Sequence, residues 1–443
     1  MSRAAKSGSV LRTAGSLVAY FLIPIVILLA SPWWLLLAIV AALAAFAVFT
    51  RPGQQVLSVI QVGIATIPQR IGSSSVVVVG IAGVVAVLVA LLAMAQGFAQ
   101  TLKETGDDQT AIVLRAGSNT ELNSVLDHET AVLVSQAPQV RRGDSGEPIA
   151  SPELVVVTSI PKKSTGLDAN VEMRGVGERA WELRPKVKIT EGRKFKPGLR
   201  ELIVGKDARR QFANVDPGST LKLNGQTWTV VGAFDSNDSH NSEVWGDTDI
   251  VASAYRRGSS TTSVTVRLTD ASAFDAFKAG LAADRRLQVD ASTTRSYFNA
   301  QSQSISNIIR ILGTVVGVIM AVGAVFGALN TMYAAVAART REIATLRAIG
   351  FRGTPVILSV MAETLLLALL GGVIGAGLAW AVFDNFTAST LGSNFSQVVF
   401  SFRVSPPLLW SGLKWALTIG LIGGLFPALR AARQPVTAGL REL

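Results

Sequence analysis

Long uncharged apolar runs recur along the chain, separated by shorter charged segments. A run needs roughly 20 mostly apolar residues to cross a bilayer as a helix. Four runs meet this requirement: Ile71–Leu102, Ile311–Ala338, Thr364–Phe383 and Leu408–Leu429. The last one contains Lys414, whose charge we expect to extend outward beside Trp410 and Trp415. The pattern predicts four core transmembrane helices.

The N-terminal part predicts a further membrane element. Thr13–Thr50 is uncharged, but a Ser-Pro-Trp-Trp sequence at residues 31–34 interrupts it, which suits a turn at a membrane interface. Each half would form about 27 Å of helix, close to the minimum for crossing. We expect a hairpin of two crossings, with a re-entrant hairpin as the alternative.

Apolar residues also recur at helical spacing between this hairpin and the first core span. They are Val56, Leu57, Ile60, Ile64 and Ile67. This spacing predicts an amphipathic helix on the inner membrane interface, with Pro68 at the elbow into the span. An ordinary linker helix is the alternative.

The net charge of +11 comes from the residues around the spans. Residues 98–303 carry 26 Lys+Arg and 26 Asp+Glu, whereas the rest of the chain carries 15 and 4. Basic residues favour the cytoplasmic side, so six crossings place both termini and residues 339–352 inside. Residues 98–303 and the short loop 384–405 then lie outside. The basic balance indicates membrane orientation and argues against a nucleic-acid site.

Short β-branched runs alternate with helix signals in the neutral external segment. Expected strands are Ala111–Leu114, Leu154–Thr158, Glu201–Val204, Thr227–Val231 and Ser263–Leu268. Expected helices are Leu122–Ser135, Lys206–Ala213 and Ala271–Ala283, with an amphipathic helix from Tyr297 to Leu312 that continues into the next span. The fold class is therefore an α-helical integral membrane protein, with four core spans plus an N-terminal hydrophobic hairpin, carrying a large α+β extracytoplasmic domain.

Candidate catalytic chemistry is sparse. The chain has no Cys, which excludes disulfides and thiolate metal sites. We interpret His128 and His240 as surface residues, the polar run Asp235–Glu243 as a solvated loop, and the basic stretch Arg184–Arg200 as a solvated surface. No catalytic, cofactor-binding or metal-binding residue is assigned.

The inner loop 338–352 has an amphipathic pattern. Ile343, Leu346 and Ile349 are predicted to share one helical face, and Gly350 is a natural helix C-cap. The charged residues Arg339, Arg341, Glu342 and Arg347 are then left to face water or a partner. The pattern alone is equally consistent with charges that only hold membrane orientation.

Together these segments resemble the MacB/FtsX class of ABC transporter permeases. The resemblance rests on Asn330-Thr-Met-Tyr, Arg341-Glu-Ile-Ala-Thr-Leu-Arg-Ala-Ile-Gly350, Glu363, and the closing Gly424-Leu-Phe-Pro-Ala-Leu-Arg-Ala-Ala-Arg433. Glu191-Gly-Arg, Leu202-Ile-Val-Gly205 and Trp228-Thr-Val-Val-Gly232 look like that family's periplasmic core domain. The apolar run Thr13–Thr50 departs from the four-span plan of the family.

The resemblance implies an ATP-driven complex. Arg339–Arg352 would be the coupling helix that contacts a cytoplasmic ABC ATPase, with the C-terminal motif of Pro427, Arg430 and Arg433 beside it. A Walker A motif, G-x-x-x-x-G-K-[ST], is missing from the sequence, so ATP and Mg are expected in the partner ATPase. Two permeases, identical or homologous, would pair with two ATPase subunits in membrane lipid, while a periplasmic adaptor is left open.

Glycines in the third core span suggest close helix packing. They are Gly371, Gly372, Gly375 and Gly377, and they could serve either a dimer contact or packing within one subunit. Glu363 lies near the inner end of the same span, where an ionisable residue needs a partner or must reach the interface.

The expected domains are an N-terminal hairpin (1–52), an interfacial helix with the first core span (53–102), an extracytoplasmic MacB-like core domain (103–303), and an FtsX-like permease domain (304–443). The family-like mechanism is mechanotransmission, in which ATP-driven motion is carried through the spans to move a drug, peptide, lipid or lipoprotein outside. The alternatives are a regulator that activates an external enzyme such as a cell-wall hydrolase, and a membrane-tethered sensor. We expect a bacterial inner-membrane protein without enzymatic activity of its own.

Overall fold

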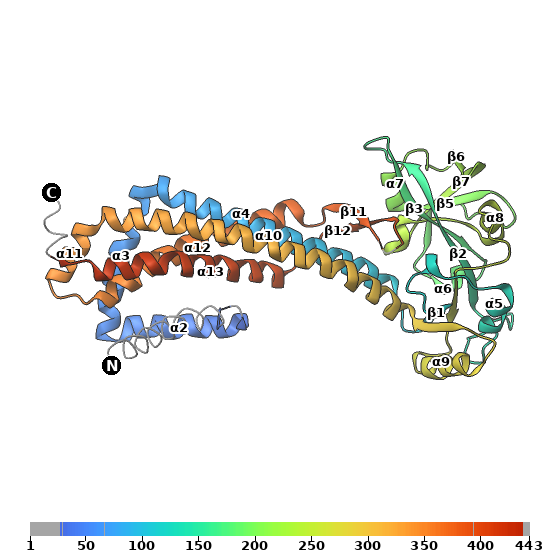
Figure 1. The fold of residues 1–443 in the computed structure, drawn as a ribbon, viewed down its shortest axis with the longest axis horizontal. Coiled ribbons are helices and arrows are strands. Elements are labelled where there is room, and N and C mark those ends of the chain that lie inside the picture. The colour runs from blue at the N-terminus through green and yellow to red at the C-terminus, as the bar shows by residue number, and fades with distance from the viewer. Residues whose placement is uncertain (1–26, 29, 66, 393, 437–443) are drawn as a thin grey trace, which may run out of the picture. The chain divides into compact units, whose positions relative to one another are not determined.

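The structure is a computed structural model that describes residues 27–28, 30–65, 67–392 and 394–436. The chain divides into two compact units (Figure 1). We call Met1–Ala93, Arg310–Asp384 and Arg403–Leu443 the membrane unit, and Met94–Ile309 and Asn385–Phe402 the external unit. The external unit therefore includes a segment that lies between the last two spans in sequence, beyond the expected boundaries of 103 and 303.

Helices form the membrane unit. The helices are α2 (Trp33–Phe49), α3 (Arg51–Ala65), the 3-10 helix Ile67–Arg70, α4 (Ile71–Thr105), α10 (Thr294–Ala338), α11 (Thr340–Ala348), α12 (Gly353–Phe383) and α13 (Pro406–Arg433). Four of them, α4, α10, α12 and α13, are long and apolar enough to cross a membrane. This confirms the four core spans. Residues 94–105 of α4 and 294–309 of α10 belong by sequence to the external unit.

The N-terminal region is only partly described. Pro32 precedes α2, in agreement with the expected turn, and most of the first half of the expected hairpin lies outside the described residues. The axes of α2 and α3 meet at 98°. Six crossings therefore remain a prediction.

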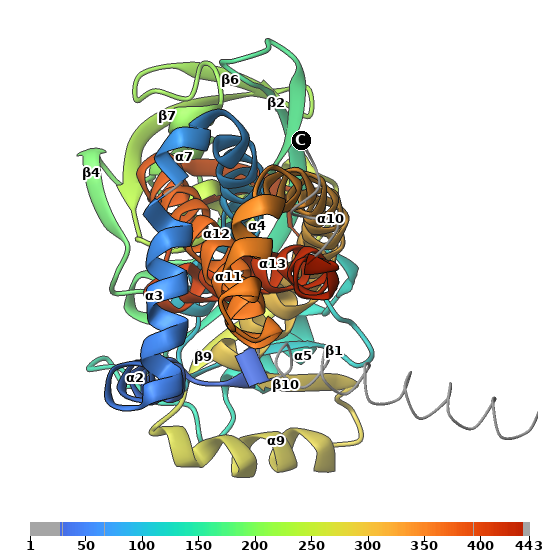
Figure 2. The same ribbon diagram turned by 90° about the vertical axis from the view of Figure 1, so that its left-hand side faces the viewer.

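The amphipathic helix expected after the hairpin is α3, and it packs against α12. Ser359 of α12 donates a hydrogen bond to the backbone oxygen of Val59 at 3.1 Å. Val59 is buried, whereas Ile64, which we placed on the apolar face, is exposed. In Figure 2, α3 lies next to α12 and runs across its direction. The helix is thus centred on Val59 and buries part of its surface against protein.

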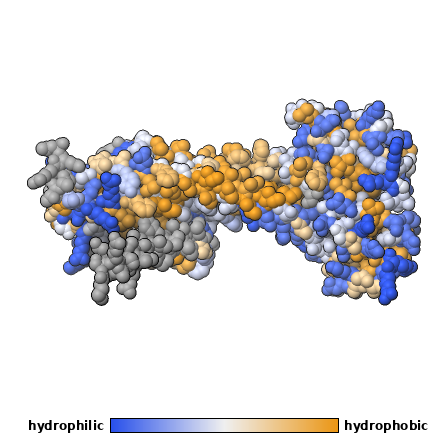
Figure 3. Space-filling view, in the orientation of Figure 1, coloured by the Kyte–Doolittle hydropathy of each residue, from blue (hydrophilic) through white to orange (hydrophobic). Residues whose placement is uncertain are grey.

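The surface of the membrane unit is apolar where the span helices face outward (Figure 3). The outward face of α10 includes Ile311, Leu312, Val315, Ile319 and Phe326, all exposed. A contiguous apolar surface of this extent is unusual for a soluble protein. It is what a lipid-facing helix requires.

A ten-stranded sheet organises the external unit, in the order β10-β1-β9-β2-β3-β8-β5-β7-β4, with β6 paired to β7. Its strands are β1 (Thr110–Arg115), β2 (Ala150–Pro161), β3 (Asp168–Val176), β4 (Lys188–Gly192), β5 (Glu201–Gly205), β6 (Thr220–Leu223), β7 (Gln226–Asp235), β8 (Val244–Asp247), β9 (Ser263–Arg267) and β10 (Val289–Thr293). The longest strand, β2, pairs with β9 through its first four residues and with β3 through the rest. It therefore joins two halves of the sheet.

Each half of the sheet has its own apolar core. One core packs α5 (His128–Ser135) and α9 (Phe274–Ala283) against β1 and β9, around Phe277. The other packs α7 (Lys206–Gln211) and α8 (Thr248–Ala254) against β2, β3, β5 and β7, around Trp228 and Phe212. The short helix α6 (Ala180–Leu183) contributes to a third cluster with Trp245. The expected α+β class is confirmed.

All five strands expected from the sequence are present, and the helices Lys206–Ala213 and Ala271–Ala283 are close to their observed bounds. The helix expected at Leu122–Ser135 begins only at His128, because the side chain of Asp127 caps it by accepting from the N–H of Thr130 at 2.7 Å. Residues 121–123 instead form a 3-10 turn.

The loop expected outside between the last two spans forms a β-hairpin. Its strands are β11 (Thr387–Leu391) and β12 (Gln397–Ser401), paired antiparallel from Thr387↔Ser401 to Leu391↔Gln397. The Val399 N–H donates to Ser242 Oγ at 2.9 Å. Phe400 packs edge-on against Phe98 with ring centroids 5.5 Å apart. The hairpin is thus an integral part of the external unit.

Candidate functional site

The inner loop folds as the short helix α11, which a glycine terminates. Gly350 has φ +106°, a left-handed conformation that glycine adopts without strain. The Gly350 N–H donates to the Arg347 oxygen at 3.2 Å, and the Phe351 N–H donates to the Leu346 oxygen at 3.1 Å. This pair of bonds is a Schellman motif. Gly350 therefore ends the helix as its C-cap.

The apolar face of α11 differs from the expected pattern at Ile349. Ile343 is buried and Leu346 half-buried, so both face the spans. Ile349 is 71% exposed, because it follows the last helical residue and the backbone is already turning toward Gly350. Arg341 and Glu342 are exposed, as expected.

Arg339 was expected to face water or a partner, and the structure corrects this. Its side chain is buried, and Nη1 lies 3.3 Å from Oε2 of Glu363, while Nε lies 2.9 Å from Oε2 of Glu342. Glu363 is buried as well, so it does not reach the interface. The reason is electrostatic, because an unpaired charge is costly near the inner end of a span where solvent is excluded, so each group needs the other as a partner.

The C-terminal motif lies beside α11. A guanidinium nitrogen of Arg347 donates to the backbone oxygen of Gln434, so this half-buried side chain joins α11 to the end of α13. Pro427 is buried within α13. Arg430 lies over the ring of Tyr333 at 5.4 Å, and Arg433 is exposed.

Three of the four glycines mediate packing within one chain. A Cβ at Gly371 would lie 2.8 Å from the Val78 oxygen, and one at Gly375 would lie 2.4 Å from the Ala82 oxygen. Both therefore let α12 approach the backbone of α4. Gly372 faces α13 in the same way, with Ala416 at 2.8 Å, whereas Gly377 meets no atom within 4 Å.

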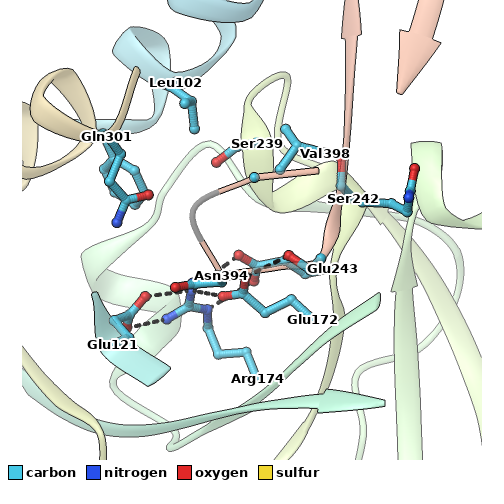
Figure 4. Close-up of a pocket in the computed structure, with 14 residues that line it drawn as sticks. Leu102, Glu121, Glu172, Arg174, Ser239, Ser242, Glu243, Gln301, Asn394 and Val398 are labelled. Carbon is cyan, nitrogen blue, oxygen red and sulfur yellow. Dashed lines mark hydrogen bonds and ion pairs between the residues drawn. The ribbon is translucent and has the colours of Figure 1, made fainter. Parts of the chain in front are cut away.

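In the external unit, charged side chains gather around Arg174 on β3 (Figure 4). Its guanidinium donates to four carboxylates at 2.8–3.1 Å, and the buried fork is well suited to such bidentate contacts. These belong to Glu121, Glu153, Glu172 and Glu243. Glu153 lies on the part of β2 that pairs with β9, and Glu172 lies on β3, so Arg174 fastens the two halves of the sheet together where β2 passes from one to the other. Glu121 belongs to the 3-10 turn, and Glu243 directly precedes β8.

Three features that we expected at the solvated surface lie in or beside this cluster. Arg184 donates to both oxygens of Glu153, at 2.6 and 2.8 Å. His240 is buried, with Nδ1 3.0 Å from Oδ1 of Asp238. The polar run 235–243 is largely buried too, because its side chains cap its own backbone and Glu243 supplies one carboxylate to Arg174. The solvated interpretation of that run, of His240 and of Arg184 was wrong, whereas His128 is exposed as expected.

The protonation of these carboxylates differs. Burial and the neighbouring charge of Glu243 raise the pKa of Glu172 from its ordinary value of 4.5 to about 7. Burial acts in the same direction on Glu153, but the guanidinium groups of Arg184 and Arg174 outweigh it and hold the pKa of Glu153 below its ordinary value. Glu172 is therefore the carboxylate of this cluster that takes up a proton near neutral pH.

The hairpin covers Glu172. Asn394 Nδ2 donates to Oε2 of Glu172 at 3.1 Å, and Ser396 Oγ donates to the same oxygen at 3.3 Å. Asn170 Nδ2 donates to the backbone oxygen of Phe395 at 3.1 Å. A cavity of about 30 Å³ remains between hairpin and cluster. The cluster thus links both halves of the sheet to the β11–β12 hairpin.

This arrangement ties the packed parts of the external unit together. Every carboxylate of the cluster is occupied by an arginine, and within the described part of the chain no group of three or more His, Cys, Asp or Glu could hold a metal ion. The sequence did carry one signal for it: Glu172 and Arg174 alternate with Val171 and Met173 on a strand that we did not expect. Opposite charges two residues apart on a strand share one face, and here that face is buried.

Comparisons with known proteins give matches to two domain families. The MacB-like periplasmic core domain matches residues 74–284, and the FtsX-like permease C-terminal domain matches residues 314–436. The macrolide export ATP-binding/permease protein MacB of Neisseria gonorrhoeae (strain ATCC 700825 / FA 1090) is 26% identical over 318 residues, which cover 66% of this chain and 48% of that protein.

The protein of the same name from Burkholderia pseudomallei (strain K96243) is 25% identical over 322 residues, covering 68% of this chain and 46% of that protein. The chain spans about half the length of the curated relatives it matches. Among solved structures, the periplasmic region of MacB from Actinobacillus actinomycetemcomitans matches with a TM-score of 0.34 and 16% identity, covering 45% of this chain and 93% of that one.

Proposed function

Because this chain belongs to the MacB/FtsX class of ABC transporter permeases, we propose that it binds a cytoplasmic ABC ATPase through α11. The observation that carries the proposal is the geometry of this helix. Its inner side is anchored by Ile343 and its end is fixed by Gly350, while Arg341 and Glu342 stay exposed. A short helix held firmly between two spans, with a charged outer face, is suited to dock in a groove of a partner protein.

The proposed mechanism is mechanotransmission. ATP and Mg are bound by the ATPase, outside these 443 residues, and its closure displaces α11. The spans then carry the displacement to the external unit, where a drug, peptide, lipid or lipoprotein is exported or extracted. The 45-residue helix α10 supports this proposal, because it contains no proline and a helix without proline resists sharp kinking.

The proposed assembly contains two permease chains and two ATPase subunits in the bacterial inner membrane. Basic residues beside the spans support cytoplasmic termini and an external unit on the far side. The names of the curated relatives, which refer to macrolide export, support export as the type of work.

The test is copurification in mild detergent with Arg341→Glu. Reversing this exposed charge should remove most of the bound ATPase without changing membrane insertion, because the side chain of Arg341 is not buried in the fold. Arg51→Glu serves as the matched control, since Arg51 is also exposed and belongs to the charges expected inside, but lies on α3. Equal ATPase recovery from both variants would contradict the assignment of α11.

A second measurement distinguishes export from regulation. Reconstituted vesicles containing the permease and its ATPase should move a substrate in an ATP-dependent manner. If instead the complex moves no solute and activates a copurifying cell-wall hydrolase, the regulatory alternative is correct.

A further inference from the structure

Arg339 occupies the one residue between α10 and α11. Its backbone (φ −110°, ψ 16°) leaves the helical conformation. Hydrogen bonds continue on either side, from the Arg339 N–H to the Val336 oxygen at 3.1 Å and from the Ile343 N–H to the Arg339 oxygen at 3.0 Å. The break is therefore a defined change of direction with its backbone groups satisfied.

The side chain of Arg339 connects three elements at this break. It contacts Glu363 of α12 and Glu342 of α11. Gly63 of α3 lies close by, since a Cβ there would be 3.6 Å from Nη1 of Arg339 and 2.7 Å from Oγ of Ser359. Glu363 is 4% exposed and Arg339 8%, whereas the side chain of Glu342 is 51% exposed. The buried partner is thus Glu363.

Apolar side chains from four helices surround the Arg339–Glu363 pair. A cavity of about 20 Å³ beside the pair provides room for a small shift of the guanidinium. The surrounding cluster draws on α10, α11, α12 and α13: Met332, Val336, Ile343, Val356, Val360, Met361, Ala428 and Ala431.

We propose that the Arg339–Glu363 pair is a positioning joint that passes displacement of α11 on to α12, and that Arg339 is not an ATPase contact. This inference rests on the proposed function, because it assumes that an ATPase moves α11. The hydrogen bond from Nη1 of Arg339 to Oε2 of Glu363 is charge-assisted and directional, so α11 cannot shift without either moving α12 or giving up the contact with Glu363. In the second arrangement Arg339 would keep only Glu342, which gives the joint two discrete states.

The experiment uses the full chain with its ATPase in lipid nanodiscs. The chain has no native Cys, so an environment-sensitive fluorophore at Ser164→Cys, an exposed site in the external unit, reports the response to ATP. Glu363→Gln should retain the ATPase at the wild-type ratio, because the outer face of α11 is unchanged. The ATP-driven fluorescence response should fall about fivefold or more.

Matched variants distinguish a joint from a general packing defect. Glu342→Gln removes the exposed partner of Arg339 and should keep most of the response. The exchange of charges in Arg339→Glu with Glu363→Arg should recover the response at least in part. If Glu363→Gln does not fold, Arg339→Met with Glu363→Leu removes both charges together, and it should assemble, bind the ATPase and remain uncoupled.

A full ATP response in Glu363→Gln or in the apolar double variant would overturn the joint while leaving the proposed function intact. Loss of ATPase binding in the folded Glu363→Gln variant would also overturn it, because Arg339 would then act on the docking surface. A wild-type chain that captures no ATPase would instead overturn the proposed function, and the joint with it.

Discussion

Glu172 shares the single guanidinium of Arg174 with three other carboxylates. Two of these, Glu121 and Glu243, lie close enough to disfavour a further negative charge. The remaining contacts of Glu172, from Asn394 and Ser396, come from the hairpin. Proton uptake at this one side chain is therefore linked to how the external unit is packed.

The first prediction concerns pH. The pKa of Glu172 is raised from 4.5 to about 7 in the folded state, so the folded state binds more protons between these values. Its contribution to stability is then complete below about pH 4.5 and is lost as pH rises through about 7, by at most about 3 kcal/mol. Thermal unfolding of wild type and Glu172→Gln should diverge over this range, with wild type losing stability relative to the variant.

Glu153 and Glu243 affect stability in the opposite sense. Their pKa values are lowered, so their contributions to stability are lost as pH falls. The comparison therefore uses the difference between the two pH profiles and not either profile alone. Parallel profiles from pH 5 to pH 8 would show that Glu172 does not titrate in this range.

Glycine positions illustrate what helices in lipid require. Two helices can approach closely where a glycine has no side chain at the point of contact. Gly371 and Gly375 let α12 meet α4, and Gly372 lets it meet α13. Gly377 lies on the same helix without any such neighbour.

The second prediction follows from that contrast. Gly375→Val should strongly reduce the yield of monodisperse protein, because its Cβ would be forced to 2.4 Å from a backbone oxygen of α4. Overpacking of this kind costs about 1–3 kcal/mol even where side chains can adjust, and backbone adjusts less. Gly377→Val should behave like wild type in size-exclusion chromatography and thermal stability. Equal behaviour of the two variants would indicate that α4 and α12 do not meet at Gly375.

Many of the helices and strands could be predicted from the sequence, for a physical reason. Spans and strands such as β1 and β5 depend on local hydrophobic patterns, which a single sequence displays directly. The strand β3 was not predicted, although Glu172 and Arg174 alternate with Val171 and Met173. The burial of its charged face could not be predicted, because charges on one face of a strand are typical of a solvent-exposed face. The burial of Arg339 could not be predicted either, because its partner Glu363 is 24 residues away in sequence and only packing brings the two together.

The N-terminal hairpin decides the number of crossings of the whole molecule. The described helices include four spans, and the bent pair α2–α3 contributes at most one more. Whether α2 crosses the bilayer depends on where its first residues lie relative to the membrane. Ala30 precedes α2 in sequence and Ser58 follows it, and both residues are exposed.

The third prediction tests this directly. A single cysteine at Ala30 should react with a membrane-impermeant maleimide added from outside intact cells, whereas one at Ser58 should react only after the cells are opened. This result corresponds to six crossings with cytoplasmic termini. If Ala30→Cys also requires opened cells while both sites react afterwards, the hairpin is re-entrant and the protein has four crossings.

The β11–β12 hairpin makes the external unit discontinuous in sequence. Because Asn385–Phe402 belongs to the same compact unit as Met94–Ile309, the chain passes between the two units four times. A soluble fragment cut at the ends of the longer segment would present Glu172 to water and lose the contacts of Asn394. The same constraint applies to exchange of the external unit between related permeases, because its two separate sequence segments have to be exchanged together. Recombination at a single pair of breakpoints would yield an external unit without its matching hairpin.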